Sequence, residues 1–211
     1  MSDKFRQFWL FGVCILLLAA GCQTDESDLP PGQAVWVDPK DSRLILNMPE
    51  LARAQLRIRR YREKTGRLVE EVAEWYGLEG RNIIAGLVLS ESNEGPPLTD
   101  PQDPNEVAAS WAAFQKQKPA YGGLEQSANI LGPVLWRRAS IGTRACVVFL
   151  QRWSVVGRQR LSAPITSLSG YYCNAPGEVF TPALAERVVK SLGLGLQPLP
   201  PLPGLQPPPI R

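Results

Sequence analysis

Proline marks both ends of the stretch that can fold. The C-terminal sequence GLGLQPLPPLPGLQPPPIR holds seven prolines between Pro198 and Pro209, so residues 196–211 cannot form a helix or a central strand. They should sample polyproline II, as a solvated tail or as the binding segment of an unknown partner. Near the other end, QTDESDLPPG is polar and broken by proline, which is typical of a flexible tether and places one at residues 22–46. A single domain at residues 47–195 remains.

The composition excludes several kinds of chemistry. The chain has no histidine, which rules out Ser-His and Cys-His nucleophile pairs, a histidine base and histidine-ligated zinc. Its net charge of +3 is small, and no run of Lys or Arg is interleaved with aromatic residues, so we expect no nucleic-acid partner. We also expect no metal and no other cofactor. Any catalysis would rest on carboxylates, Lys, Tyr, Ser or Cys.

The N-terminus is typical of an exported chain. A short basic region precedes an apolar run at residues 8–20, which is short for a membrane span, and small residues then lead into Cys22. This arrangement resembles the lipobox of bacterial lipoproteins. The resemblance implies a signal peptide at residues 1–21 and a membrane anchor through lipid, palmitate included, on Cys22. Gln23 then favours the periplasmic face of the outer membrane over the inner membrane; an ordinary signal peptide or an N-terminal membrane anchor is the alternative.

Two cysteines remain after export, Cys146 and Cys173. In an oxidising compartment a lone pair of cysteines in one domain is most simply a disulfide. The bond would close a loop of about 27 residues, for which the chain-entropy model gives roughly 3 kcal/mol of stabilisation. Two free buried thiols are the alternative.

Between the tether and the tail, the spacing of apolar residues favours helices. Leu68, Val72 and Tyr76 recur four apart, and Thr181 followed by Pro182 is a cap residue with proline at the first helical position of a helix at 181–192. The sequence therefore predicts a mainly α domain. We expect its other helices at about 51–64, 68–76, 82–92, 106–116 and 139–154, and two modest strands at 43–47 and 163–168.

One carboxylate has an unusual setting in this pattern. The stretch LVLSESNEG places Glu91 between two serines at the end of an apolar run. On a helix, Ile84, Leu87 and Glu91 share one face, so the carboxylate would point into the interior or into a cleft. The apolar wall and the negative end of the helix dipole would both favour a protonated carboxyl, as a general acid requires. The alternatives are a Glu held by a buried Arg and a side chain turned outward at a frayed helix end.

Three blocks of the chain resemble the lytic transglycosylases of the lysozyme-like superfamily. In the first, LVEEVAEWYGLEGRNIIAGLVLSESNEG (68–95), the family's Glu-Ser pair falls on Glu91 and Ser92. The second, SWAAFQ (110–115), matches a Gly-Leu-Met-Gln-like block, with alanine in place of glycine. The third, SGYYCNAPGEV (169–179), matches a Tyr-Asn-Ala-Gly block, with a cysteine between tyrosine and asparagine.

This resemblance implies a lysozyme-like α-helical fold and cleavage of the bond between N-acetylmuramic acid and N-acetylglucosamine in peptidoglycan glycan strands. Glu91 would be the single catalytic acid/base: it would protonate the leaving oxygen and then take the proton of the sugar's own 6-hydroxyl, which closes an anhydro ring. The residues implied to bind substrate are Ser92, Phe114, Gln115, Tyr172 and Asn174. A second carboxylate would instead make a hydrolase, and the candidates are Glu94, Asp100, Asp103 and Glu106.

Two other hypotheses stand beside catalysis. One is a non-catalytic envelope lipoprotein whose lysozyme-like scaffold binds glycan or an envelope partner. The other is an envelope lipoprotein unrelated to glycan, in which the motif matches arise by chance. Catalysis requires Gln115 and a tyrosine to face Glu91 across an open groove, whereas chance matches would leave Gln115 and Asn174 far from Glu91.

Overall fold

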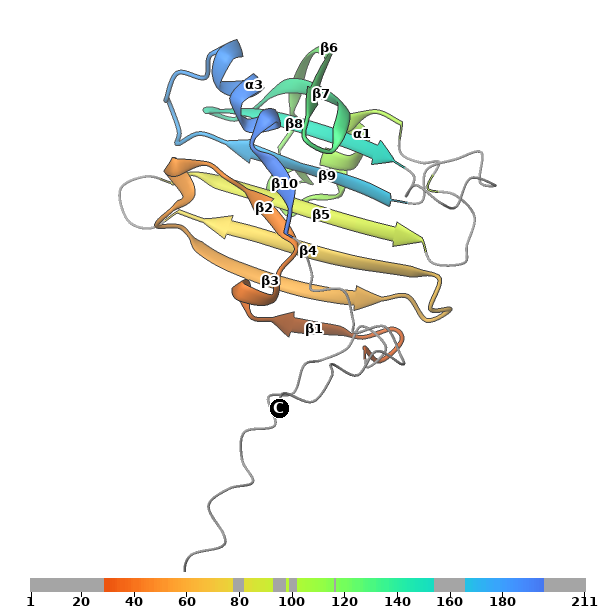
Figure 1. Cartoon of the computed structure of the whole chain (residues 1–211). Coiled ribbons are helices and arrows are strands. Elements are labelled where there is room, and N and C mark those ends of the chain that lie inside the picture. The colour runs from red at the N-terminus through yellow and green to blue at the C-terminus, as the bar shows by residue number, and fades with distance from the viewer. Residues whose placement is uncertain are drawn as a thin grey trace, which may run out of the picture.

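The chain folds around one eight-stranded sheet with the strand order β1-β3-β4-β5-β9-β8-β7-β6 (Figure 1). A computed structural model describes residues 29–77, 82–92, 98, 102–115, 117–153 and 166–195. The strands of the sheet are β1 (Ala34–Val37), β3 (Gln55–Arg62), β4 (Leu68–Tyr76), β5 (Ile84–Ser92), β6 (Ala120–Asn129), β7 (Gly132–Ile141), β8 (Arg144–Trp153) and β9 (Thr166–Cys173). The other elements are β2 (Leu44–Leu46), β10 (Leu192–Leu194), the helices α1 (Pro104–Ser110), α2 (Ala112–Gln115) and α3 (Pro182–Lys190), and 3-10 turns at Pro39–Asp41 and Pro49–Leu51.

The sheet consists of two antiparallel halves that meet in the middle. One half contains β1, β3, β4 and β5, the other contains β6, β7, β8 and β9, and β5 pairs with β9 between them. After β5 the chain crosses one face of the sheet through α1 and α2 and returns at the far edge as β6. Consecutive strands of this sheet are otherwise neighbours, so the β5–β9 pair is the long-range contact that closes the sheet.

The predicted mainly α fold is wrong, and with it the lysozyme-like helical domain. Leu68, Val72 and Tyr76 do recur four apart, but four is also a multiple of the two-residue period of a strand. They share one face of β4, while Ala73 and Trp75 are buried on the other. Because both faces are covered, the strand has no simple alternation of apolar and polar residues. The helices expected at 51–64, 68–76, 82–92 and 139–154 are therefore wrong: these ranges contain β3, β4, β5 and β8.

Other predicted elements are present. Thr181 accepts a hydrogen bond on its side chain from the backbone N–H of Leu184, and Pro182 is the first residue of α3, as the sequence indicates. Helices α1 and α2 fall at the expected 106–116, and β2 falls at the expected 43–47. Strand β9 overlaps the end of the strand expected at 163–168. The region expected to be tether thus contains β1 and β2, which are part of the folded domain.

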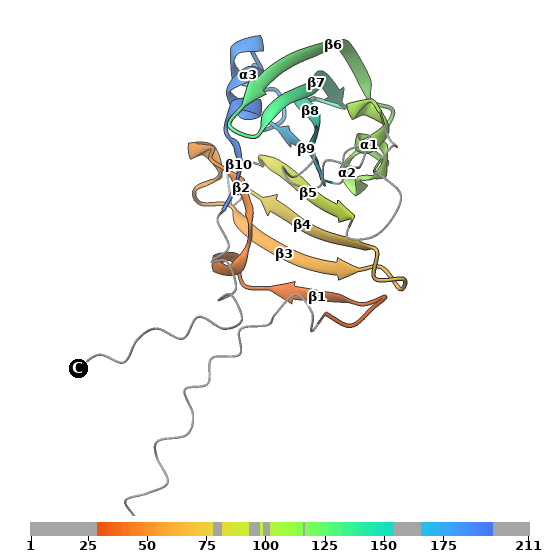
Figure 2. The same cartoon turned by 45° about the vertical axis from the view of Figure 1, so that its right-hand side comes forward.

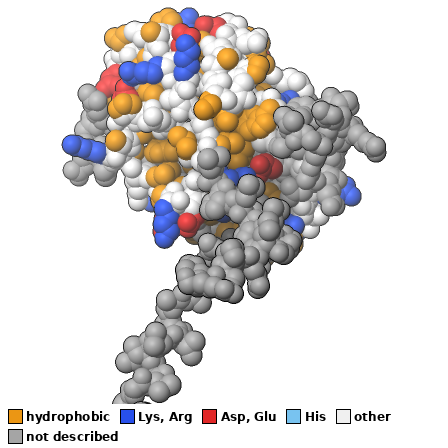
Figure 3. Space-filling view, in the orientation of Figure 1, with side chains coloured by type: hydrophobic (Ala, Val, Ile, Leu, Met, Phe, Trp, Pro, Cys, Tyr) orange, Lys and Arg blue, Asp and Glu red, His pale blue; other side chains and the backbone are white. Residues whose placement is uncertain are grey.

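Each face of the sheet has its own cover (Figure 2). Face A carries Ala73, Leu87 and Phe149, and it is covered by α3 and by the small antiparallel sheet of β2 and β10. In the space-filling view of this side, apolar side chains gather across the middle, and charged side chains of both signs stand beside one another in small groups (Figure 3). Face B carries Val72, Val148 and Tyr171, and α1 and α2 cover its middle.

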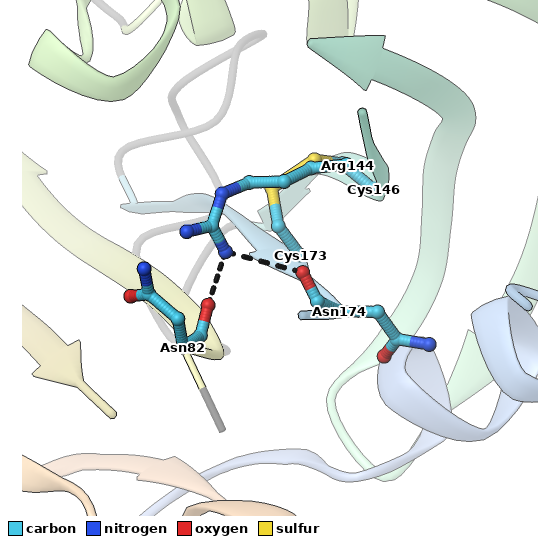
Figure 4. The surroundings of a disulfide bond; sticks show 5 residues. All are labelled: Asn82, Arg144, Cys146, Cys173 and Asn174. Carbon is cyan, nitrogen blue, oxygen red and sulfur yellow. Dashed lines mark hydrogen bonds between the residues drawn. A yellow bond between two sulfur atoms is a disulfide. The ribbon is translucent and has the colours of Figure 1, made fainter. Parts of the chain in front are cut away.

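The predicted disulfide is present at one end of the central strands. Cys146 of β8 and Cys173 of β9 are directly opposite each other on face B, are bonded, and are fully buried. Beside them, the Arg144 guanidinium donates hydrogen bonds to the backbone carbonyls of Asn82 and Asn174 (Figure 4). These contacts tie the residues that precede β5 to the residue that follows β9, so one end of the central strands is fixed by a covalent bond and by an arginine.

Several sequence predictions lie outside the described residues. They include the signal peptide at 1–21, Cys22 and the proline-rich tail at 196–211. Within the described part of the chain, no helix has both the length and the apolar character that a membrane crossing requires.

The close approach of β5 and β9 can be tested at Gly170. A methyl group there would overlap the carbonyl oxygen of Gly86, and backbone in the middle of a sheet cannot move aside. We expect Gly170→Ala to lower the free energy of unfolding by about 3 kcal/mol in urea denaturation. Gly123→Ala on β6 is the control, because no atom lies within 4 Å of the added methyl group. It should change stability by less than about 0.5 kcal/mol, and equal effects of the two changes would contradict the tight pairing.

Candidate functional site

Glu91 lies on a strand and not at the end of a helix. On β5, Leu87, Leu89 and Glu91 alternate onto face A, so the carboxylate extends a stripe of buried leucines. Val69 of β4 and Thr166 of β9 are its neighbours across the sheet. Glu91 does share a face with buried apolar residues, as the sequence indicates, but the two-residue alternation of a strand places it there and not the period of a helix.

The carboxylate of Glu91 is held by Arg43, the residue before β2. Arg43 Nη1 donates to Glu91 Oε1 at 3.2 Å, and Nη2 donates to Oε2 in a short ion pair. The two side chains are only 16% and 25% exposed. A planar guanidinium that meets a carboxylate with two parallel hydrogen bonds is among the strongest charged contacts in proteins. Of the alternatives drawn from the sequence, the Glu held by a buried Arg describes this geometry.

A second carboxylate completes the arrangement. Glu71 of β4 is 1% exposed, and its Oε1 accepts hydrogen bonds from Ser42 Oγ at 2.6 Å and from the backbone N–H of Arg43 at 2.9 Å. Its Oε2 accepts from Arg60 Nε at 2.7 Å. A buried carboxylate is tolerated when its oxygens are bonded and its charge is balanced, and both conditions are met here.

These contacts join five residues into one unit, which we call the Arg43 cluster: Ser42, Arg43, Arg60, Glu71 and Glu91. It contains two arginines and two glutamates, so its charges cancel. Arg60 also donates to the backbone carbonyl of Asp41 at 2.7 Å. The Arg60–Glu71 bond joins β3 to β4, and the other bonds run between the segment that leads into β2 and the strands β3, β4 and β5. The cluster therefore fastens that segment onto face A.

The residues implied to bind substrate are not brought together around Glu91. Gln115 is on α2, over face B, and its side chain donates to the backbone carbonyl of Ser110. Ser92 follows Glu91 on β5, so its side chain points to face B as well. Thr166 of β9 is the strand partner of Glu91. Tyr172 and Asn174 are six and eight residues further along the chain, and an extended strand of that length spans about 20 and 27 Å.

Two of these residues have structural roles. The side chain of Phe114 is 2% exposed and packs edge-on against Tyr171, as Trp111 does. Burial, together with the nearby charge of Glu74, raises the pKa of Tyr171, so its hydroxyl stays protonated at neutral pH. Asn174 donates from its side chain to the backbone carbonyl of Val179. These contacts hold the C-terminal end of β9 and the α1–α2 layer in place.

The candidate second carboxylates are divided between described and undescribed parts of the chain. Asp103 caps α1 and receives two hydrogen bonds from Arg137 of β7, at 2.8 and 2.6 Å. The Arg137 hydrogen bond holds the pKa of Asp103 below its usual value. Glu106 accepts from the backbone N–H of Gln102. Glu94 and Asp100 lie outside the described residues, and within the described part no three acidic or cysteine side chains gather as metal ligands would.

The structure has an exposed aromatic and basic surface that the sequence analysis missed. Trp36 of β1 is directly opposite Arg59 of β3, and Arg57 is two residues further along β3 on the same face. Trp36 is 73% exposed, and both arginines are exposed. We call these three residues the Trp36 surface. The signal in the sequence is QLRIRRYR at 55–62, which alternates as a strand does, but a helical interpretation hides the alternation.

The chain matches no protein-family model, no curated protein and no solved structure. Any function must therefore be argued from the geometry of the described residues and from the resemblances in the sequence.

The fastening role of the Arg43 cluster can be tested by removing its central residue. Arg43→Ala leaves Glu91 without its guanidinium and takes one positive charge from beside Glu71. We expect the free energy of unfolding to fall by about 3 kcal/mol. Lys190→Ala is the control: it removes an exposed pair with Glu186 and should cost at most about 0.5 kcal/mol. Similar losses in the two variants would show that the cluster does not hold the fold.

A second test concerns pH and Asp103. Because the pKa of Asp103 is lower in the folded state, its contribution to stability is present above the unfolded pKa of about 4 and is lost as pH falls through the folded pKa. Asp103→Asn keeps a capping side chain but loses the charge. We expect this variant to be about 1 kcal/mol less stable at pH 7, with the difference shrinking toward pH 2. A difference that stays constant across a urea-denaturation series in pH would contradict the role of the ion pair.

Proposed function

We propose that the protein is an exported, lipid-anchored envelope protein that acts by binding and does not cleave glycan. The observation that carries the proposal is the geometry of Glu91. Both of its oxygens accept hydrogen bonds from Arg43, whereas Gln115 is on the layer that covers the opposite face of the sheet. A general acid needs a carboxyl that faces the leaving oxygen of a bound sugar, and Glu91 faces a guanidinium.

Two other described carboxylates support the same proposal: Asp103, a candidate from the sequence, and Glu71. Asp103 is engaged by Arg137, and Glu71 is engaged by Arg60, Ser42 and the backbone of Arg43. Each of these groups has a place in the fold that depends on its charge. None of them faces Glu91 across a groove in the way that paired catalytic carboxylates do.

Export and anchoring rest on two features of the chain. The N-terminal segment resembles a lipoprotein signal that ends at Cys22. The Cys146–Cys173 disulfide is formed between buried residues, and stable disulfides of this kind belong to oxidising compartments such as the periplasm. We therefore propose a location at the periplasmic face of the outer membrane, with the lipid on Cys22 as the link to the membrane.

Anchoring can be tested by labelling cells that express the full chain with a palmitate analogue. We expect label on the wild-type protein and recovery in the outer-membrane fraction, because the acylated cysteine would become the mature N-terminus. Cys22→Ser should lose both. Cys14→Ser is the matched control and should keep both, since that cysteine lies within the expected signal peptide. An unlabelled wild-type protein would contradict the anchor.

The absence of glycan cleavage can be tested with purified residues 23–211 and isolated peptidoglycan. Mass spectrometry of the released fragments should show no anhydromuramyl and no reducing-end products, with an active lytic enzyme as the positive control. Anhydromuramyl products that disappear in Glu91→Gln would overturn the proposal in favour of a transglycosylase. Reducing-end products that disappear in the same variant would overturn it in favour of a hydrolase.

A further inference from the structure

We propose that the Trp36 surface binds the anionic phospholipid headgroups of the membrane to which the chain is tethered. This inference rests on the proposed lipid anchor for the identity of the surface that is bound. Its consequence is a defined orientation: the β1 edge of the sheet would lie on the bilayer, and the β6 edge would point away from it. Figures 1 and 2 show these two strands at opposite ends of the sheet.

The three residues form one continuous patch. Trp36 and Arg59 are directly opposite in the β1–β3 ladder, and Arg57 is at a diagonal position on the same face. In an antiparallel pair, opposite Cβ atoms are about 5 Å apart and diagonal neighbours about 7–8 Å apart. A phosphate group could therefore contact both guanidinium groups while the indole enters the layer beside it. Indole rings are favoured at membrane–water interfaces because they have an apolar body and one hydrogen-bond donor.

The exposure of Trp36 is otherwise unexplained. Burial of apolar surface is the main force that stabilises a fold, and most large aromatic side chains are at least partly covered. Trp36 is 73% exposed and is on an edge strand, whereas Trp75, Trp111 and Trp136 are at most 7% exposed. A contact outside the domain would explain why this position carries an indole.

The charges at this edge suit an anionic surface. Neither Arg57 nor Arg59 forms a salt bridge with a described residue; Arg57 lies over the ring of Tyr76, 5.4 Å from its centre. The acidic groups on the same face are Glu70 and Glu74 of β4, and Glu74 is directly opposite Arg57 in the β3–β4 ladder. Asp38, which follows β1, is paired with Lys40. Glu70 accepts a hydrogen bond from Ser90. Burial, together with the nearby charge of Glu74, raises the pKa of Tyr76. Three further exposed cations lie in the turns before and after β3: Arg53, Lys64 and Arg67.

The position of β1 along the chain identifies the membrane as the occupant. Ala34 is twelve residues after Cys22, a length that spans at most roughly 40 Å when fully extended. The Trp36 surface would thus stay within that distance of the bilayer, and a tethered surface meets its partner at a high effective concentration. Other anionic partners lack this built-in proximity.

The test uses residues 23–211, without the lipid, and sedimentation with vesicles of phosphatidylcholine alone or with 30 mol% phosphatidylglycerol. We expect binding to the anionic vesicles that weakens as salt is raised, because exposed charges are screened. The double variant Arg57→Gln/Arg59→Gln should bind at least tenfold more weakly, since each basic residue contributes about fivefold near such a surface. Lys118→Gln/Arg138→Gln removes two exposed cations elsewhere and should stay within twofold of wild type.

Vesicles with brominated acyl chains give a second measurement, the quenching of tryptophan fluorescence. We expect quenching in the wild type and little in Trp36→Phe, because the other described tryptophans are not exposed. All of the substituted side chains are exposed, so the melting temperatures of the variants should match the wild type. That match would separate a loss of binding from a loss of fold.

Three outcomes would overturn the inference. The first is that the wild type does not bind anionic vesicles, or that the Lys118/Arg138 control loses as much vesicle binding as the Arg57/Arg59 variant. The second is binding to soluble anionic polymer or to peptidoglycan with the same dependence on Arg57 and Arg59 and no quenching by bilayers. The third is a dimer that forms through this surface and excludes lipid. Each is independent of palmitate labelling at Cys22, so failure here is distinguishable from failure of the anchor.

Discussion

The pairing of β5 with β9 is the contact on which the rest of the molecule depends. It joins two halves that are each built from neighbours in sequence, and it forms only when strands some eighty residues apart meet. Glycine makes the approach possible on both faces: Gly170 lies against the backbone of β5, and Gly86 leaves room for Trp111. The aromatic layer of α1 and α2 and the Cys146–Cys173 bond then lie over a surface that exists only because these two strands are paired.

The Arg43 cluster shows how a charged group can be part of a core. Glu71 and Glu91 are at alternate positions on adjacent strands, so their carboxylates meet the single guanidinium of Arg43. Hydrophobic contacts alone would allow the short strand β2 to slide along face A, because apolar packing has little directional preference. The fixed geometry of the guanidinium allows one position, and β10 pairs with β2 in the register that results.

Sequence reasoning succeeded where a local rule was sufficient. The Thr181-Pro182 start of α3 depends on adjacent residues, and the disulfide was predicted from the two cysteines that remain when Cys14 and Cys22 are assigned to the expected lipoprotein signal. It failed where tertiary structure decides: a spacing of four suits both a helix and a strand, and β4 and β9 are covered on both faces. The partner of Glu91 is 48 residues away, so a Glu held by an Arg could be expected only as a possibility, without naming Arg43. The Trp36 surface was hidden because β1 lies in a segment whose prolines are typical of a tether.

The position of β10 has a mechanical consequence. Gly195 donates its backbone N–H to the carbonyl of Arg43 at 2.7 Å, and the preceding residues pair with β2. Gly195, the last described residue, therefore lies beside the segment that connects β1 to β2. Tension between a membrane anchor at one end and a partner of the tail at the other would pass through β10, β2 and β1. The short β1–β3 and β2–β10 pairs would separate before the long central strands do. The edge of the domain could then unfold under tension while the disulfide-linked central strands stay paired.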